Sequence, residues 1–150
     1  MAVQRDRPYG NFNFLVDLGT GDSEGPLAGF EEVSMPQAWV DVIEYRNGNE
    51  KENSTRNIPG RDHYGNVVLK RGIIGSLDLY SWWNDVRNGN IKGFRTVTIQ
   101  LQNEDHSAVV MTWKLLRAWP VRYEGPALNA KGQEVAMETL ELAFERLEME

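Results

Sequence analysis

The chain has 150 residues, of which 41% are apolar and 25% charged, a globular composition that suits one domain with its own core. It contains no cysteine, which excludes disulfide bonds, thiolate metal sites and a cysteine nucleophile, and fits folding in a reducing cytoplasm. The net charge of −6 disfavours sequence-independent nucleic-acid binding, which depends on Lys and Arg neutralising phosphates. No apolar run approaches the roughly 20 residues of a membrane span, and no secretory signal is visible, so we expect no membrane insertion.

The first third of the chain predicts strands. Residues 1–9 are expected to form a mobile N-terminal arm, and the apolar alternation over 12–18 predicts a strand. A glycine-rich loop follows at 19–26. Strands are then expected over 30–35 and 39–46, and the short turn between them predicts a hairpin.

Residues 47–65 are expected to form a long polar loop. The stretch 47–57 is wholly polar apart from one glycine. Loops beyond about 12–15 residues are uncommon in compact domains and are usually functional or disordered.

One helix is expected, over 77–88. Ser76 precedes it as a candidate N-cap, and Gly89 can end it in the left-handed conformation. The helical period predicts a core-facing stripe of Leu79, Tyr80, Trp83 and Val86.

Most of the remaining segments predict strands, over 66–73, 94–101, 109–116, 118–123 and 134–147. A repeated β-α-β rhythm is absent, which argues against a parallel doubly wound sheet. The chain is therefore predicted to be a single, mainly β domain. Two packed antiparallel sheets would form a sandwich or partial barrel with one flanking α-helix.

No residue constellation predicts an enzyme, a cofactor site or a metal site. Gly19, Gly21 and Gly25 miss the dinucleotide-binding spacing by one residue, and no core-facing helix opens after them. The two histidines, His63 and His106, have no recognisable nucleophile motif around them. Five tryptophans favour core and interface packing, with an aromatic ligand groove on a β-sandwich binding module as the alternative.

An ordered set of short motifs resembles the tube proteins of contractile phage tails and phage-like injection systems, and more distantly the ring protein of type VI secretion. The most specific part is Trp119-Pro120 followed by the strand Glu138–Leu142. The other matching segments are residues 13–16, 29–34, 42–48, 58–60, 67–72 and the helix bearing Leu79, Tyr80 and Trp83.

The resemblance implies a structural subunit. Such proteins form hexameric rings that stack head to tail, and each subunit lends hairpins to a β-barrel that lines the lumen. The implied partners are other copies of the chain, a sheath outside, a baseplate or spike hub and a tail terminator at the ends, and protein cargo or DNA in the lumen. Assembly would take place in the bacterial cytoplasm, and the product would be a virion-like or extracellular particle. A tube-end or adaptor protein of the same machine is the alternative.

Two sets of candidate residues follow from the resemblance. Period-2 alternation turns one face of each lumen strand inward, but the sequence does not fix which face. Glu138 and Glu141 are three residues apart, so a regular strand places them on opposite faces; both face the lumen only if a bulge intervenes, and otherwise one belongs to a subunit contact paired with Lys or Arg. The expected inter-ring residues are Asn47, Asn49, Glu50, Lys51, Glu52, Arg56 and Ile58, and the lumen candidates are Glu31, Glu32, Ser34, Asp41, Glu44, Glu138, Thr139 and Glu141.

Overall fold

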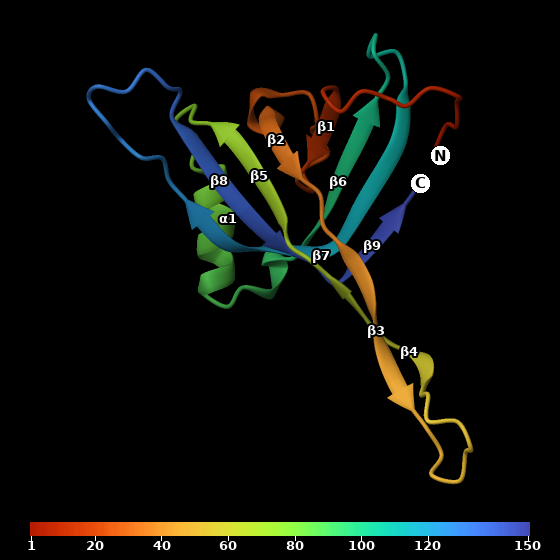
Figure 1. Ribbon diagram of the computed structural model, residues 1–150. Helices are drawn as coiled ribbons and strands as arrows, with labels where there is room; N and C mark the ends of the chain where they lie inside the picture. The colour runs from red at the N-terminus through yellow and green to blue at the C-terminus, as the bar shows by residue number, and fades with distance from the viewer.

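The computed structural model describes residues 1–150, the side chain of Ile91 excepted. It contains nine strands, one α-helix and two short 3-10 helices (Figure 1). In chain order they are β1 Phe14–Asp17, η1 Pro26–Ala28, β2 Phe30–Ser34, β3 Ala38–Tyr45, β4 Arg56–Tyr64, β5 Val67–Gly72, α1 Asp78–Arg87, η2 Ile91–Gly93, β6 Arg95–Gln102, β7 Val109–Glu124, β8 Met137–Ala143 and β9 Arg146–Met149.

Strand β7 is long enough to serve two layers. Its first half pairs with β6 and β9, and its second half pairs with β8, all antiparallel. Arg117, with φ of 53°, lies where the strand passes from one layer to the other. The first layer is thus β1-β6-β7-β9 and the second is β7-β8-β5-β2, and Figure 1 shows them opening from β7 as a V.

The core fills the space between the two layers. Strand β8 alternates buried and half-buried residues, so Leu140 and Leu142 point inward beside Leu69 of β5. Val97 and Leu115 of the first layer face them and are fully buried. The fold prediction is confirmed: two antiparallel sheets form an open sandwich with one helix packed on β7.

The buried face of α1 differs from the predicted stripe. Leu79 and Trp82 are each 1% exposed, and Val86 packs against the core. Tyr80 is exposed and Trp83 only partly buried, so their assignment to the core face is corrected. Leu79, Trp82 and Val86 are spaced i, i+3 and i+7, which also fits a helical stripe. Because two tryptophans are adjacent, the helical period alone does not decide which of them is buried.

The predicted hairpin over 30–46 is wrong. Strand β2 pairs with β5, whereas β3 pairs with β4 and forms a separate two-stranded sheet. Val33 of β2 packs against the core beside Leu69, its partner residue on β5, so burial determines where β2 pairs. The segment 47–65 is also corrected, because only residues 46–55 are loop and the rest is largely β4.

Two strand boundaries differ from the expected ones. Strand β7 runs through Arg117 without ending, and the segment 134–147 divides into β8 and β9. Residues 1–9 lie along the β6–β7 turn, where the amide of Val3 donates to the carbonyl of Val110 at 2.9 Å. Arg5 forms an ion pair with Glu104, and its hydrogen bond lowers the pKa of Glu104 to about 2.

Candidate assembly surfaces

Strands β3 and β4 form a hairpin arm, residues 38–64, that projects from the body (Figure 1). Every residue of β3 is exposed, including Val42 at 66% and Ile43 at 51%. Ile58 on β4 pairs with Ile43 and is also exposed. A two-stranded ribbon with apolar side chains in water is marginal alone and marks an interaction surface.

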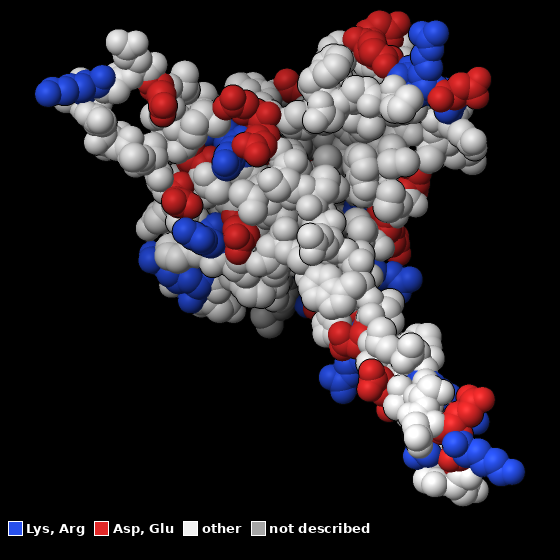
Figure 2. All heavy atoms as spheres, viewed as in Figure 1, with Lys and Arg blue, Asp and Glu red and all other residues white. Residues whose placement is uncertain are grey.

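The loop at the end of the arm is held by its own hydrogen bonds. Arg46 donates to the carbonyls of Glu52 at 3.0 Å and Glu50 at 2.9 Å, and the Glu50 carboxylate pairs with Arg56 at 2.9 Å. Figure 2 shows acidic and basic side chains side by side along the arm, with no single sign prevailing. The expected inter-ring residues Asn47, Asn49, Glu50, Lys51 and Glu52 lie in this loop, and Arg56 and Ile58 follow on β4.

Near the body, the arm carries a small aromatic and charged cluster. Trp39 stacks on His63 with ring centroids 5.5 Å apart, and Nε2 of His63 lies 2.6 Å from an Asp41 carboxylate oxygen. Asp41 and Glu44, two of the lumen candidates, therefore lie on the arm and away from the other lumen candidates.

A polar face covers the side of the second layer that points away from the core. Glu32 pairs with Lys70 at 3.4 Å, and Glu141 accepts a hydrogen bond from Asn66 at 3.0 Å. Thr139 lies next to Lys70 in the β5–β8 ladder. A shallow depression on this face is lined by Val68, Lys70, Arg122, Glu124, Gly125, Thr139 and Glu141. The structure thus brings together the lumen candidates Glu32, Ser34, Thr139 and Glu141, and interleaves them with basic residues that sequence reasoning did not single out.

Glu138 does not belong to that face. It is 3% exposed and points to the core side, where its carboxylate accepts from Nε and Nη2 of Arg71 at 2.9 and 2.5 Å. The prediction of Glu138 as a lumen residue is therefore wrong. Strand β8 is regular from Met137 to Ala143, so no bulge brings Glu138 and Glu141 to one side.

Arg71 forms the centre of a buried ionic cluster. Its other contacts are the Asp78 carboxylate, at 2.9 and 2.6 Å, and the carbonyl of Leu27 at 2.8 Å. All five N–H groups of the guanidinium therefore have acceptors, as a buried arginine requires. The cluster ties β5, β8, the first turn of α1 and η1 together. Sequence reasoning missed Arg71, because nothing in the local pattern marks a buried cation.

The cluster changes the pKa of its neighbours. Burial raises the pKa of Asp78, but hydrogen bonds from Arg71 and Ser76 outweigh it and leave that pKa below its ordinary value. Burial, with a hydrogen bond to Glu138, raises the pKa of Tyr123 to about 12. The carboxylate of Asp78 is thus held ionised and the Tyr123 hydroxyl held neutral.

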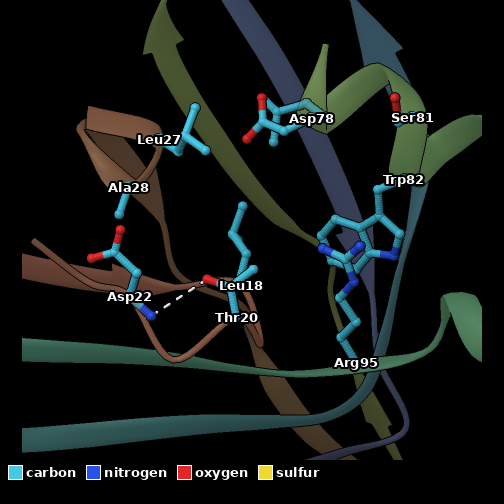
Figure 3. A pocket seen from close by; sticks show the side chains of 10 residues that line it. Leu18, Thr20, Asp22, Leu27, Ala28, Asp78, Ser81, Trp82 and Arg95 are labelled. Atoms are coloured by element: carbon cyan, nitrogen blue, oxygen red, sulfur yellow. Dashed lines mark hydrogen bonds between the residues drawn. The ribbon is translucent and has the colours of Figure 1, made fainter. Parts of the chain in front are cut away.

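A pocket of about 360 Å³ lies between α1 and the glycine-rich loop (Figure 3). Arg95 rises from β6 and lies against the indole of Trp82, 4.6 Å from the ring centroid. Burial lowers the pKa of Arg95. Leu18 and Leu27 supply apolar walls.

Carboxylates of the chain itself accept hydrogen bonds from the backbone amides of the glycine-rich loop. One carboxylate oxygen of Asp17 accepts from the amides of Gly19, Thr20 and Gly21, at 2.9 to 3.1 Å. Asp22 caps the next turn in the same way, through the amides of Glu24 and Gly25. These amides are occupied by acceptors within the chain, unlike those of a phosphate-binding loop.

The described residues contain neither a metal-binding cluster nor a membrane-spanning helix. They contain no group of three or more His, Cys, Asp or Glu side chains arranged to hold a metal ion. Nor does any helix among them have the length and apolar character needed to cross a membrane.

The family model of the T4-like virus tail tube protein gp19 matches residues 10–148. The chain belongs to this tail tube protein family. Comparison with curated proteins gave no match. The resemblance identified in the sequence is therefore confirmed, and the chain is a tube protein of the type found in phage tails and contractile injection systems.

The similarity to solved structures covers nearly the whole length of this tube protein. A chain in the sheath–tube complex of the extracellular contractile injection system PVC, in its extended state, has TM-score 0.82 and 26% identity, covering 95% of this chain and 91% of that one. A chain in the baseplate of the anti-feeding prophage has TM-score 0.80 and 27% identity over 97% of both chains. Hcp1 from Flavobacterium johnsoniae shares the fold, with TM-score 0.54 and 14% identity over 91% and 93%.

Proposed function

We propose that this chain forms hexameric rings that stack into the inner tube of a contractile injection system or phage tail. The observation that carries the proposal is the whole-chain similarity to a chain in the PVC sheath–tube complex. A sheath would enclose the tube, and a baseplate or spike hub and a terminator would close its ends. Rings would assemble in the bacterial cytoplasm, and the tube would carry protein cargo or DNA after release in a virion-like or extracellular particle.

The polar face of the second layer suits the lumen. Lys70, Thr139 and Glu141 point outward from these strands, whereas Leu69, Leu140 and Leu142 point to the core, as a sheet between a core and water requires. In the proposed tube, six copies of this layer join edge to edge into a ring-wide β-barrel, which removes exposed strand edges. Because Lys70 and Arg122 lie among Glu32, Glu124 and Glu141, the lumen surface would be mixed in charge and not uniformly acidic.

The hairpin arm suits contacts between rings. It extends beyond the two layers and exposes apolar side chains on both of its faces. In the proposed tube these side chains are buried against subunits of the neighbouring ring, and the polar loop 46–55 reaches farthest.

Electron microscopy of the purified protein over a range of concentrations tests the proposal. Six-membered rings are expected, with stacked tubes at high concentration. A strictly monomeric sedimentation profile over the same range, with no rings in micrographs, would contradict it.

A tube-end or adaptor protein of the same machine is the second candidate. The similarity to a chain in the structure of the PVC sheath/tube terminator, at 26% identity, favours it. We expect a main tube subunit expressed alone to form tubes of many lengths, because head-to-tail contacts do not limit growth, and we expect an adaptor to stop at one ring or a few rings. The distribution of tube lengths in micrographs therefore separates the two, and no catalytic activity is proposed for either.

A further inference from the structure

A groove of about 450 Å³ opens between the two layers, on the side where β1 and β2 are the edge strands. Its walls are mainly apolar side chains that the core covers only in part, among them Phe14, Val33, Met35 and Trp113. Glu31 and Glu32 lie at its rim. Glu32 is paired with Lys70, whereas Glu31 takes part in no ion pair within the described chain.

A second feature complements this groove. The β7–β8 loop, residues 125–136, projects from the body at the upper left of Figure 1. It exposes Leu128 by 86% and Val135 by 74%, more than any large apolar side chain except Met1. Its tip is an ordered turn, in which the amides of Lys131 and Gly132 donate to Asn129 at 3.0 and 2.9 Å.

We propose that the groove receives the β7–β8 loop of a second copy of this chain, with Leu128 among the apolar walls and Lys131 at Glu31. This inference deepens the proposed function and rests on it, because it identifies a contact between tube subunits. Loop and groove are different parts of one chain, so the contact is heterologous and repeats around a ring or along a filament.

Charge favours the loop over the hairpin arm as the occupant of the groove. The loop carries Leu128 and, three residues further on, the cation Lys131 at its ordered tip, while its one acid, Glu134, lies nearer to β8. An exposed leucine close to a cation matches an apolar groove with a free acid at its rim. At the end of the arm, Arg46 and Arg56 are engaged within the arm, by the carbonyls of Glu50 and Glu52 and by the Glu50 carboxylate, so the remaining cation is Lys51, which stands between two acids in the sequence. A lysine between two acids is a poorer partner for the free acid at the rim than Lys131.

Disulfide trapping tests the contact directly, because the natural chain has no cysteine. The double variant Leu128→Cys/Met35→Cys should give a ladder of covalent oligomers after mild oxidation of assembled protein. A disulfide requires Cα atoms within about 7 Å, so random collision contributes little. The control Leu128→Cys/Ser107→Cys, with its second cysteine in the β6–β7 turn, should give no ladder.

A charge exchange supplies a second readout. Glu31→Lys and Lys131→Glu should each reduce the fraction of protein in rings, and the double variant should restore it. Both side chains are exposed, so the fold is expected to persist in each variant.

Three results would overturn the inference. Normal tubes from the Leu128→Cys/Met35→Cys variant without any ladder would refute the contact and leave the proposed function intact. A ladder from Ile58→Cys/Met35→Cys in place of the loop variant would assign the groove to the arm. Absence of rings from the wild-type protein would reject the proposed function, and this contact with it.

Discussion

Glu138 and Glu141 lie on the same strand, but their surroundings differ in burial and in charge. Glu138→Lys would put a second cation beside the buried Arg71, and removing one partner of a buried ion pair costs about 3–5 kcal/mol. Glu141→Lys changes only the half-buried polar face. We expect Glu138→Lys to unfold at much lower urea concentration than wild type and Glu141→Lys to unfold near the wild-type midpoint. Equal midpoints would contradict the buried position of Glu138.

The ionic cluster should also make stability depend on acid pH. Because the pKa of folded Asp78 lies below its ordinary value of 3.8, its ionised form stabilises the fold above that value. This stabilisation is lost as the pH falls through the lower folded-state pKa. Asp78→Asn should therefore unfold more easily than wild type at neutral pH, and the difference should narrow below about pH 4.

Denaturant titrations from neutral pH to about pH 3 measure this effect. Asp85→Asn, an exposed position on the same helix, is the matched control and should follow the wild-type curve. A constant difference between Asp78→Asn and wild type at every pH would show that the carboxylate charge is not what stabilises the cluster.

At the scale of the element, α1 contains two adjacent tryptophans with different surroundings. Trp82 is fully buried and its indole N–H donates to the carbonyl of Gly93, so Trp82→Ala should cost about 3–5 kcal/mol. Trp83 is partly exposed and packs against Tyr80 and the guanidinium of Arg87, so Trp83→Ala should cost about 1 kcal/mol. Chemical denaturation of both variants measures the two losses of stability. A larger loss for Trp83→Ala than for Trp82→Ala would contradict the assignment of Trp82 as the buried tryptophan.

The hairpin arm shows why element partners are hard to predict from local patterns. Strand β3 has apolar residues at Val40, Val42 and Ile43, so its alternation does not mark one core face. Much of its partner β4 is polar, and Arg56–Tyr64 resembles loop by composition. Both strands form because they pair with each other outside the core, and no hydrophobic pattern marks such a pair.

At the scale of the whole molecule, we expect the hairpin arm to be needed for the stacking of rings and the body to be sufficient for the formation of a ring. Deleting residues 49–55 leaves a short turn between β3 and β4 and removes no core residue. The variant should stay folded and form rings, but should not form long tubes. Replacing 49–55 by seven Gly and Ser residues keeps the length of the loop and serves as the control. Long tubes from the deletion variant would refute the inter-ring role of this loop.

The sequence by itself determined the fold class, the family and most strand positions. Alternation in β5, β6 and β8 marks one buried face each, since a buried face selects apolar side chains at every second residue. Motifs spread along the chain carried the resemblance to tube proteins.

Only the tertiary structure decided which strands pair, which tryptophan is buried and where Glu138 points. These depend on partners distant in sequence: β5 for β2, Gly93 for Trp82, and Arg71 for Glu138. A local pattern records which side of a strand is apolar, but it does not record which distant group satisfies a buried charge or covers an exposed edge.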